Sequence, residues 1–372
     1  MLSLDNPALL AVETPALVVD GVALDANIAR MAETAHEHGI ALRPHAKTHK
    51  SAEIARRQIA GGAVGICCAT IGEAEGLAAA GITGLLITAP TIGVAKFARI
   101  AGLHARHPLM IVVDHAMQVE GLARAVQADG PPLGVLVDVD VGQARTGVTS
   151  PADAVALAKA IAHHPNLKFA GLQGYAGHAQ HITTPVERRQ SAAAAGRMLL
   201  DCLTVLGETK HAPLMVSGSG TGAHLHDLAG PYTELQVGSY VFMDADYARI
   251  LDEHGSGPPF APSLFVLATV VSVNRPGQVT VDAGTKALAT NGPPPCVIIG
   301  APPGSTYRFS GDEHGAIAIP AGQAAPKLGA RLLIGATHCD PTVNLHASYR
   351  VVGGNGDVSE WPILGRYGDS EQ

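Results

Sequence analysis

The sequence predicts an α/β protein, a (β/α)8 TIM barrel followed by a small C-terminal β domain. Between Ala41 and Asp244, short apolar runs alternate with amphipathic stretches of helical periodicity. About eight such strand–helix units fit within roughly 200 residues, the length typical of a barrel of parallel strands. After Asp244 the pattern changes to β-branched runs with tight turns, which indicates a second, mainly β domain.

The candidate barrel strands are short apolar runs bounded by glycine, proline or polar residues. In chain order they cover residues 41–47, 63–70, 84–90, 109–115, 134–141, 169–177, 214–220 and 233–240. The amphipathic stretches that follow them cover residues 51–62, 72–81, 94–108, 116–130, 150–165 and 186–208. Ser150 before Pro151 is typical of a helix N-cap with proline at the first helical position. An open doubly wound sheet is the alternative, but it usually carries a GxGxxG motif in its first unit, which this sequence lacks.

The boundary between the two domains is predicted near residue 250. The Gly/Pro-rich segment 254–263 is typical of a hinge, and Pro276-Gly277 fits the centre of a type II turn between two strands. We therefore expect a barrel over residues 21–250 and a β domain formed by residues 1–20 and 251–372. The apolar segment 14–20 is one strand more than the barrel needs, so it is assigned to the β domain or the linker.

Composition excludes several classes of protein. The net charge of −7 and the absence of long basic runs argue against a nucleic-acid-binding surface. The five cysteines are irregularly placed and form no CxxC pair, which favours a reducing cytoplasm over a disulfide framework or zinc ribbon. The N-terminus lacks the basic residues of a signal peptide, and no apolar run reaches membrane-spanning length. We therefore expect a cytoplasmic protein with no membrane partner.

Polar side chains gather where the predicted barrel strands end, which is where barrel enzymes place their active sites. In strand order they are Lys47, Arg145, Tyr175, His181, the loop 217–222, Ser239 and Tyr240. This convergence predicts an active site more strongly than any single motif does.

The loop 217–222, with the sequence SGSGTG, is a candidate anion site. Glycines allow backbone N–H groups to approach an anion closely, and Thr221 adds a hydroxyl. A helix beginning at Ala223 would direct its positive end at the same place. The alternative is a simple turn, which short Gly/Ser/Thr loops more often form.

Lys47 is a candidate nucleophile at the end of the first strand. Arg43, His45, His49 and Lys50 surround it in the sequence, and burial beside these groups should disfavour its ammonium form. A Schiff-base lysine together with a phosphate loop indicates pyridoxal phosphate (PLP). The alternative is a surface lysine in a basic turn, and Lys50 is a rival for the same role.

Two further groups complete the candidate chemistry. Arg145 could face the pyridine nitrogen of the cofactor and prevent its protonation, or it could pair with Asp138 or Asp140. His338 and Asp340, two residues apart, would share a face of an extended strand and suit Mn, Mg, Co or Zn. If Cys339 pointed inward instead, a softer metal would be favoured.

Taken together, the motifs resemble the D-threonine aldolases. The matching stretches occur in the same order, from about Glu13 to about His346: RPHAKTHKS, VDVGQARTG, LQGYAGHAQH, SGSGTG, ELQVGSYVFMDADY, DAGTKAL, GDEHG and HCDPTVNLH. The resemblance implies an alanine racemase-like fold and a PLP- and metal-dependent aldehyde-lyase. Its substrates would be D-threonine and related D-β-hydroxy-α-amino acids, which it would cleave to glycine and an aldehyde.

The resemblance also implies roles for individual residues. Lys47 would carry PLP, His181 would be the base near the substrate hydroxyl, and His338 with Asp340 would hold the metal. Arg145 would meet the pyridine nitrogen. The remaining cofactor contacts would come from Tyr175, Ser219, Gly220, Thr221, Gly238, Ser239 and Tyr240. The family implies a homodimer.

Related activities remain as alternatives. D-serine and D-threo-3-hydroxyaspartate dehydratases share the fold, but they tend to carry cysteine where this chain has Asp340. A racemase would need a second base opposite Lys47, and a non-catalytic PLP carrier would resemble the barrel alone.

Overall fold

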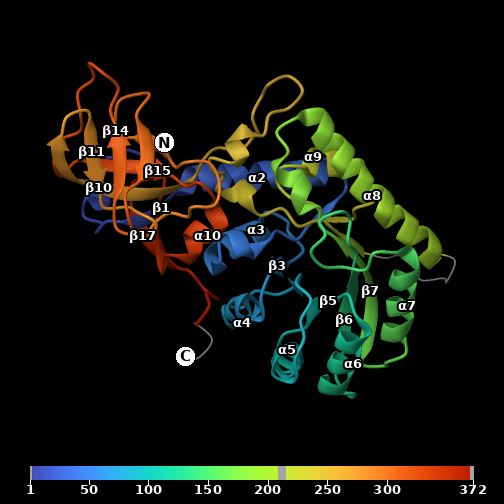
Figure 1. Cartoon of the computed structure of the whole chain (residues 1–372). Helices are drawn as coiled ribbons and strands as arrows, with labels where there is room; N and C mark the ends of the chain where they lie inside the picture. The colour runs from blue at the N-terminus through green and yellow to red at the C-terminus, as the bar shows by residue number, and fades with distance from the viewer. Residues whose placement is uncertain (1, 208–214, 369–372) are drawn as a thin grey trace. The chain divides into compact units, whose positions relative to one another are not determined.

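The computed structural model describes residues 2–207 and 215–368, which form two compact units (Figure 1). The β unit comprises Met1–Arg30, Ser239–Leu251 and Ser256–Ile363. The barrel unit comprises Met31–Gly238, Asp252–Gly255 and Leu364–Gln372. The first residue of the predicted strand 214–220 and the last of the predicted helix 186–208 lie outside the described residues.

The barrel unit contains eight parallel strands in the order β2-β9-β8-β7-β6-β5-β4-β3. They are β2 (Ala41–Leu42), β3 (Ile66–Cys68), β4 (Leu85–Ile87), β5 (Leu109–Val113), β6 (Leu133–Asp138), β7 (Leu167–Gly174), β8 (Met215–Gly218) and β9 (Glu234–Leu235). Each of these strands overlaps one of the predicted apolar runs. The prediction of a TIM-like barrel of parallel strands is thus confirmed.

Backbone hydrogen bonds join the two end strands of this order, β2 and β3. Val64 N–H donates to Leu42 O, and Cys67 N–H donates to Pro44 O, both over 2.8 Å. On the other side of β2, the pairing with the β9 segment continues as far as His45, whose N–H donates to Val237 O. Pro44 has no N–H, but its carbonyl still contributes to the closure.

Helices follow the strands and cover the outside of the barrel unit (Figure 1). They are α3 (Ala52–Ala60), α4 (Ile71–Ala79), α5 (Val94–Arg106), α6 (Ala116–Ala125), α7 (Pro151–Ala162), α8 (Pro185–Gly207) and the short α9 (His224–Asp227). As predicted, Ser150 caps α7 and accepts from the Asp153 N–H, with Pro151 at the first helical position.

The barrel interior is packed with apolar side chains. Cys67, Leu86, Val112 and Leu136 come from four neighbouring strands and form one fully buried cluster. Burial raises the pKa of the Cys67 thiol well above its usual value, so this cysteine is a core residue and not a nucleophile.

The β unit is built on a nine-stranded sheet with the main order β13-β14-β11-β10-β1-β16-β17. In addition, β15 pairs with β10, and β12 pairs with β15. Its strands are β1 (Ala16–Asp20), β10 (Leu264–Arg275), β11 (Gln278–Val281), β12 (Cys296–Ile299), β13 (Thr306–Phe309), β14 (Gly315–Ala318), β15 (Arg331–Gly335), β16 (Ser348–Val352) and β17 (Val358–Pro362). The N-terminal strand β1 pairs antiparallel with β10 and parallel with β16. Gly277, in the predicted turn between β10 and β11, has the positive φ (72°) that a type II turn requires.

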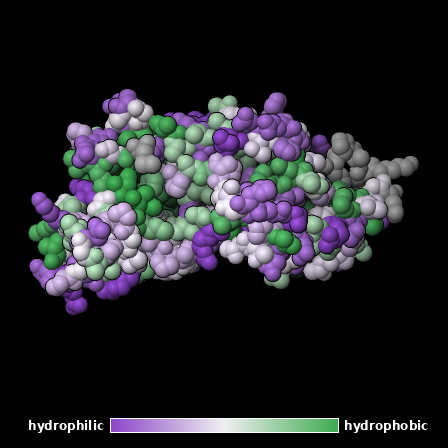
Figure 2. Space-filling model, turned by 90° about the horizontal axis from the view of Figure 1, so that it is seen from above, coloured by the Kyte–Doolittle hydropathy of each residue, from purple (hydrophilic) through white to green (hydrophobic). Residues whose placement is uncertain are grey.

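The chain also contains the helices α1 (Pro7–Leu10), α2 (Gly21–Glu37) and α10 (Cys339–Asn344). Within the described ranges, no helix is both long and apolar enough to cross a membrane. The face shown in Figure 2 mixes hydrophilic and hydrophobic residues.

Candidate active site

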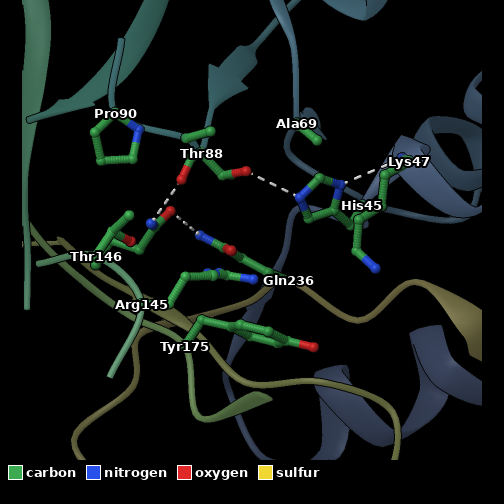
Figure 3. Close-up of a pocket in the computed structure, with 11 residues that line it drawn as sticks. His45, Lys47, Ala69, Thr88, Pro90, Arg145, Thr146, Tyr175 and Gln236 are labelled. Atoms are coloured by element: carbon green, nitrogen blue, oxygen red, sulfur yellow. Dashed lines mark hydrogen bonds between the residues drawn. The ribbon is translucent and has the colours of Figure 1, made fainter. Parts of the chain in front are cut away.

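A cavity of about 380 Å³ opens in the barrel unit, at the carboxyl ends of its strands (Figure 3). Its lining residues are His45, Lys47, Ala69, Thr88, Ala89, Pro90, Arg145, Thr146, Gln173, Tyr175 and Gln236. The cavity therefore brings together three of the predicted site residues: Lys47, Arg145 and Tyr175.

Lys47 reaches the cavity from a turn and not from a strand. The paired segment ends at His45, and Ala46–Thr48 form the single 3-10 turn η1. The His45 ring organises this turn, because its Nδ1 accepts from the Lys47 N–H (3.3 Å) and its Nε2 lies 2.9 Å from Thr88 Oγ1. Thr88 Oγ1 in turn donates to Cys68 O, so the ring donates from Nε2. Lys47 is thus held by a defined hydrogen-bonded chain.

Lys50, the rival for the lysine role, has a different environment. Its Nζ forms an ion pair with Glu73 of α4, and the two side chains are only 10% and 2% exposed. Glu73 also accepts from the Ala69 N–H (2.6 Å). Lys50 is therefore a structural cation, and Lys47 is the lysine that lines the cavity.

Arg145 and Tyr175 form one wall of the cavity. The guanidinium carbon of Arg145 lies 5.6 Å from the centre of the Tyr175 ring, within the range of a cation–π contact. Asp140 accepts from the Gly142 and Ala144 N–H groups, and Asp138 accepts from Thr146 and Gln173. The predicted alternative, a salt bridge from Arg145 to either aspartate, is therefore not what the structure shows.

Two buried glutamines form the floor of the cavity, and their hydrogen bonds determine their orientation. Gln173 Nε2 donates to Thr88 O and to Asp138 Oδ1, both over 2.9 Å, so its Oε1 is left to accept. Gln236 Nε2 donates to that oxygen (3.0 Å) and to Ser217 Oγ (2.9 Å). The chain continues through Ser217 to Glu234, which forms a buried pair with Arg43. These contacts hold the floor rigid.

Asp138 lies at the edge of this network. Burial raises the pKa of its carboxyl to about 6, while hydrogen bonds from Gln173 and Thr146 act in the opposite direction. The nearby Arg145 also lowers that pKa, but by less. A permanent cation that lines the cavity, Arg145, thus lies near a buried carboxyl whose pKa is raised.

The glycine loop is more tightly packed than its sequence suggests. Ser219 has a φ of 71°, which is uncommon for a residue with a side chain. The N–H groups of Gly222 and Ala223 both donate to the side-chain oxygen of Gln180, over 2.9 and 3.1 Å. The expected helix does follow the loop, but α9 has only four residues. Two of the donors assigned to an anion are thus already used within the protein.

Other polar groups of this region are available to a phosphate. Among the described residues, the Gly220 N–H donates to no acceptor, and the buried Thr48 Oγ1 has no hydrogen-bond partner. Gly238 lies against that hydroxyl, because a Cβ at Gly238 would be 2.7 Å from Thr48 Oγ1. With the Lys47 amine and the Arg145–Tyr175 wall, these groups fit a flat, aldehyde-bearing cofactor with a phosphate.

Three other predicted site residues are not among the described residues that line the cavity. His181 ends the turn η2 (Gly177–His181) and is exposed, and it is not among the described residues that line the cavity. Ser239 and Tyr240 begin the turn η3 (Ser239–Val241) of the β unit, where the buried Tyr240 ring packs edge-on against Phe260. The roles assigned to these residues stay predictions.

His338 and Asp340 do not share a strand face. The strand β15 ends at Gly335, His338 is the N-cap of α10, and Asp340 lies in the first helical turn. The helix begins here because Pro341 and an acidic residue suit a first turn, and Asp244 accepts from the Cys339 N–H (3.0 Å). The prediction of an extended H-x-D pair is therefore wrong, although the metal assignment itself stays a prediction.

Local contacts of α10 bear on that assignment. The Asn291 amide lies 2.9 Å from His338 Nδ1, so a metal would have to bind Nε2. Cys339 is fully buried and its thiol donates to Met243 O (3.4 Å), which removes it as a rival ligand. Within the described ranges, no group of three or more His, Cys, Asp or Glu side chains is arranged to hold a metal. A metal here would rely on few protein ligands.

Several residues of the site escaped sequence reasoning: Thr88, Thr146, Gln173, Gln180 and Gln236. Gln173 and Gln236 carried a usable signal, because each is a polar residue near the end of an otherwise apolar run. Gln180 carried none, since the two N–H groups that its side-chain oxygen accepts from are more than forty residues away.

Comparisons with known proteins agree with this architecture. Residues 19–246 match the family model of the alanine racemase N-terminal domain, and residues 263–352 match a putative serine dehydratase domain. The chain is 42% identical to a D-threonine aldolase of an Arthrobacter species, over 96% of this chain and 94% of the relative. It is 37% identical to a 3-hydroxy-D-aspartate aldolase of Paracoccus denitrificans, over 95% of this chain and 92% of the relative.

Solved structures show the same likeness. The crystal structure of a D-threonine aldolase from Filomicrobium marinum superimposes with a TM-score of 0.92 at 40% identity, covering 96% of this chain and 97% of that one. A D-threo-3-hydroxyaspartate dehydratase from a Delftia species follows with a TM-score of 0.82 at 28% identity, covering 96% and 99%.

The parallel barrel with its lysine-lined cavity, together with the β unit, defines an enzyme of the alanine racemase-like fold. More narrowly, the chain belongs to the family of the D-threonine aldolases and 3-hydroxy-D-aspartate aldolases. The prediction of a lyase is thereby confirmed.

Proposed function

We propose that this protein is a PLP- and divalent-metal-dependent lyase that cleaves D-threonine and related D-β-hydroxy-α-amino acids to glycine and an aldehyde. The observation that carries the proposal is the position of Lys47, which lines the cavity beside Arg145 and Tyr175. The likeness to the Arthrobacter D-threonine aldolase supports the choice of substrate.

The barrel unit would hold the cofactor. Lys47 would bind its aldehyde through Nζ, and Tyr175 and Arg145 would contact its ring. Its phosphate would be held by Ser219, Gly220, Thr221 and Gly238, with Ser239 and Tyr240 following in the chain. When bound, PLP withdraws electron density from the α-carbon of an amino acid. Because Arg145 is a permanent cation, it would keep a facing ring nitrogen unprotonated.

The reaction needs a base at the substrate hydroxyl. His181 would accept the hydroxyl proton as the Cα–Cβ bond breaks, and a proton would return to the α-carbon to give glycine. The exposure of His181 allows it to exchange that proton with solvent. Atoms balance without an oxidant or added water, since one D-threonine gives one glycine and one acetaldehyde.

His338 and Asp340 would hold the divalent metal, which would supply Lewis-acid activation of the substrate hydroxyl. One imidazole and one carboxylate, with water completing the shell, suit Mn, Mg, Co or Zn. A related D-threo-3-hydroxyaspartate dehydratase mutant has been solved in a metal-free form, which supports metal use among the relatives.

We also propose that the protein is a cytoplasmic homodimer that acts on small D-amino acids. The absence of a membrane-spanning helix among the described residues is compatible with this proposal. Sedimentation equilibrium at micromolar concentration tests the dimer, and a mass of one chain would contradict it.

A dehydratase acting on D-serine or D-threo-3-hydroxyaspartate is the second candidate. The match of residues 263–352 to a putative serine dehydratase domain favours it, as does 30% identity to the Delftia dehydratase over 96% of this chain. Asp340, where dehydratases tend to carry cysteine, favours the aldolase.

Product analysis separates the two candidates. The purified protein is incubated with D-threonine, D-serine and D-threo-3-hydroxyaspartate, with and without Mn²⁺. Glycine and acetaldehyde from D-threonine would support the aldolase. A keto acid with ammonia would identify a dehydratase and overturn the main proposal.

Replacement of Lys47 tests the cofactor assignment. We expect Lys47→Ala to lose the visible absorbance of lysine-bound PLP and to reduce activity by at least about 1,000-fold, because the covalent attachment is gone. Lys50→Met removes the lysine that pairs with Glu73, and the fraction of this variant that folds should keep the visible absorbance band. An absorbance band that persists in Lys47→Ala would refute the assignment.

A further inference from the structure

Gln180 links the turn η2 to the glycine loop. Its side chain is fully buried, and its oxygen accepts from the N–H groups of Gly222 and Ala223. Its nitrogen donates to Ala176 O over 3.1 Å. Because backbone N–H groups can only donate and a carbonyl can only accept, these three hydrogen bonds fix which end of the amide faces the loop.

Two glycines of the loop owe their identity to this residue. A Cβ at Gly220 would lie 2.6 Å from the side-chain oxygen of Gln180, and a Cβ at Gly222 would lie 2.0 Å from its backbone oxygen. Any side chain at either position would displace Gln180. The glycines therefore serve close packing against η2, in addition to any ligand.

The segment that Gln180 anchors also forms part of the cavity wall. Ala176, which accepts from Gln180, directly follows Tyr175, and Tyr175 lines the cavity beneath the Arg145 guanidinium. A Cβ at Gly177 would lie 2.8 Å from the Tyr175 ring, so η2 and this ring are in close contact. One buried amide thus connects the wall of the cavity to the loop proposed to bind phosphate.

We propose that Gln180 is a positioning residue that sets the glycine loop for the phosphate of the cofactor and does so as a neutral group. This inference rests on the proposed function. A carboxylate in the same place could still accept from Gly222 and Ala223, but it would place a negative charge against an anion-binding loop. The choice of an amide over a carboxylate is then a specificity feature for the phosphate.

The test compares PLP with pyridoxal, which has the same ring and aldehyde but no phosphate. For Gln180→Glu at pH 8 we expect the Kd for PLP to rise about 10-fold or more and the Kd for pyridoxal to change less than about 2-fold. Both are measured by absorbance titration of the apoprotein. Burial should raise the pKa of the introduced carboxyl above its usual value, so lowering the pH toward 5.5 should protonate it. The PLP affinity of the variant relative to wild type should then recover.

Gln118→Glu is the matched control. Gln118 is also buried, its oxygen accepts from the N–H groups of Asp114 and His115, and its nitrogen donates to Asp114. It belongs to the capping box of α6, and the side-chain hydrogen bonds described for it all stay within residues 114–118. Its replacement should cost stability yet leave the ratio of the two Kd values within about 2-fold of wild type, because ring contacts are common to both ligands.

Gln180→Asn keeps the inference testable if the charged variant does not fold. It is neutral but one methylene shorter, so it cannot reach both the loop and Ala176. We expect a rise of about 3-fold in the Kd for PLP and none for pyridoxal. Equal effects on both ligands, or no effect, in the variants that fold would overturn the inference and leave the proposed function intact. A wild-type protein that takes up no PLP would overturn both.

Discussion

Asp227 is buried in α9, next to the glycine loop. Burial raises the pKa of its carboxyl to about 7, and the nearby Ser219 side chain lowers that pKa by a smaller amount. In the unfolded chain an aspartate titrates near 3.9, so between about pH 4 and pH 7 the folded protein binds more protons. This contribution to stability is complete below pH 4 and is lost as the pH rises through 7.

The stability of Asp227→Asn relative to wild type should therefore increase as the pH rises. The amide stays neutral, so the free energy of unfolding of the variant relative to wild type should increase by about 2–3 kcal/mol from pH 5 to pH 8. Urea unfolding at both pH values measures this difference. Asp201→Asn on the exposed face of α8 is the control for removal of a charge. A difference for Asp227→Asn that does not change with pH would contradict the prediction.

At the scale of elements, the turn that carries Lys47 is held by groups outside it. Lys50, with a φ of 46°, leaves the turn and pairs with Glu73 of α4. The Leu364 N–H donates to Lys50 O over 2.7 Å, so the C-terminal segment of the barrel unit also braces this turn. A Cβ at Gly365 would lie 2.6 Å from the Glu73 Cα, which shows how closely the segment packs there.

Breaking the Lys50–Glu73 pair should destabilise the barrel unit strongly. We expect Glu73→Gln to cost about 3–5 kcal/mol, because a buried ammonium is left without its partner charge. The double variant Lys50→Met, Glu73→Leu should lose less than the single one. The exposed pair Arg56–Glu53 of α3 provides the comparison, and Glu53→Gln should cost under about 1 kcal/mol. Equal losses in urea unfolding for the buried and exposed variants would show that the pair is not structural.

The same scale explains which elements could be predicted. Apolar runs such as Leu109–Val113 are buried on both faces, and this leaves a continuous pattern that predicts a strand. The start of α10 leaves no such pattern, because its first N–H is satisfied by Asp244, ninety-five residues earlier in the chain. Likewise, the sequence predicts Lys47 at a strand end, whereas His45 is the N-cap of η1 and its ring accepts a hydrogen bond from the Lys47 N–H.

For the whole molecule, the alternation of strands and helices was enough to predict a parallel sheet, and the count of about eight units without a GxGxxG motif favoured a barrel over an open sheet. The same pattern predicted that Lys47, Arg145 and Tyr175 share one site, because the carboxyl ends of barrel strands converge. It was not enough for Gln180 or for the glutamine floor, whose roles depend on backbone partners distant in the sequence.

The two proposed chemistries belong to different units of the chain, and this makes their losses separable. Lys47 and the cavity are in the barrel unit, whereas His338 and Asp340 are in the β unit. Treatment with a chelator should therefore abolish cleavage of D-threonine while the visible absorbance of bound PLP and the far-UV dichroism remain. Added Mn²⁺ should restore activity to the wild type. Added Mn²⁺ should not restore activity to Asp340→Ala, because a carboxylate ligand is missing and metal affinity falls at least about 10-fold.

Lys47→Ala should show the reverse, with the absorbance of PLP lost and Mn²⁺ binding kept. Cleavage that survives complete chelation would remove the metal from the proposal and favour a metal-independent activity such as racemisation.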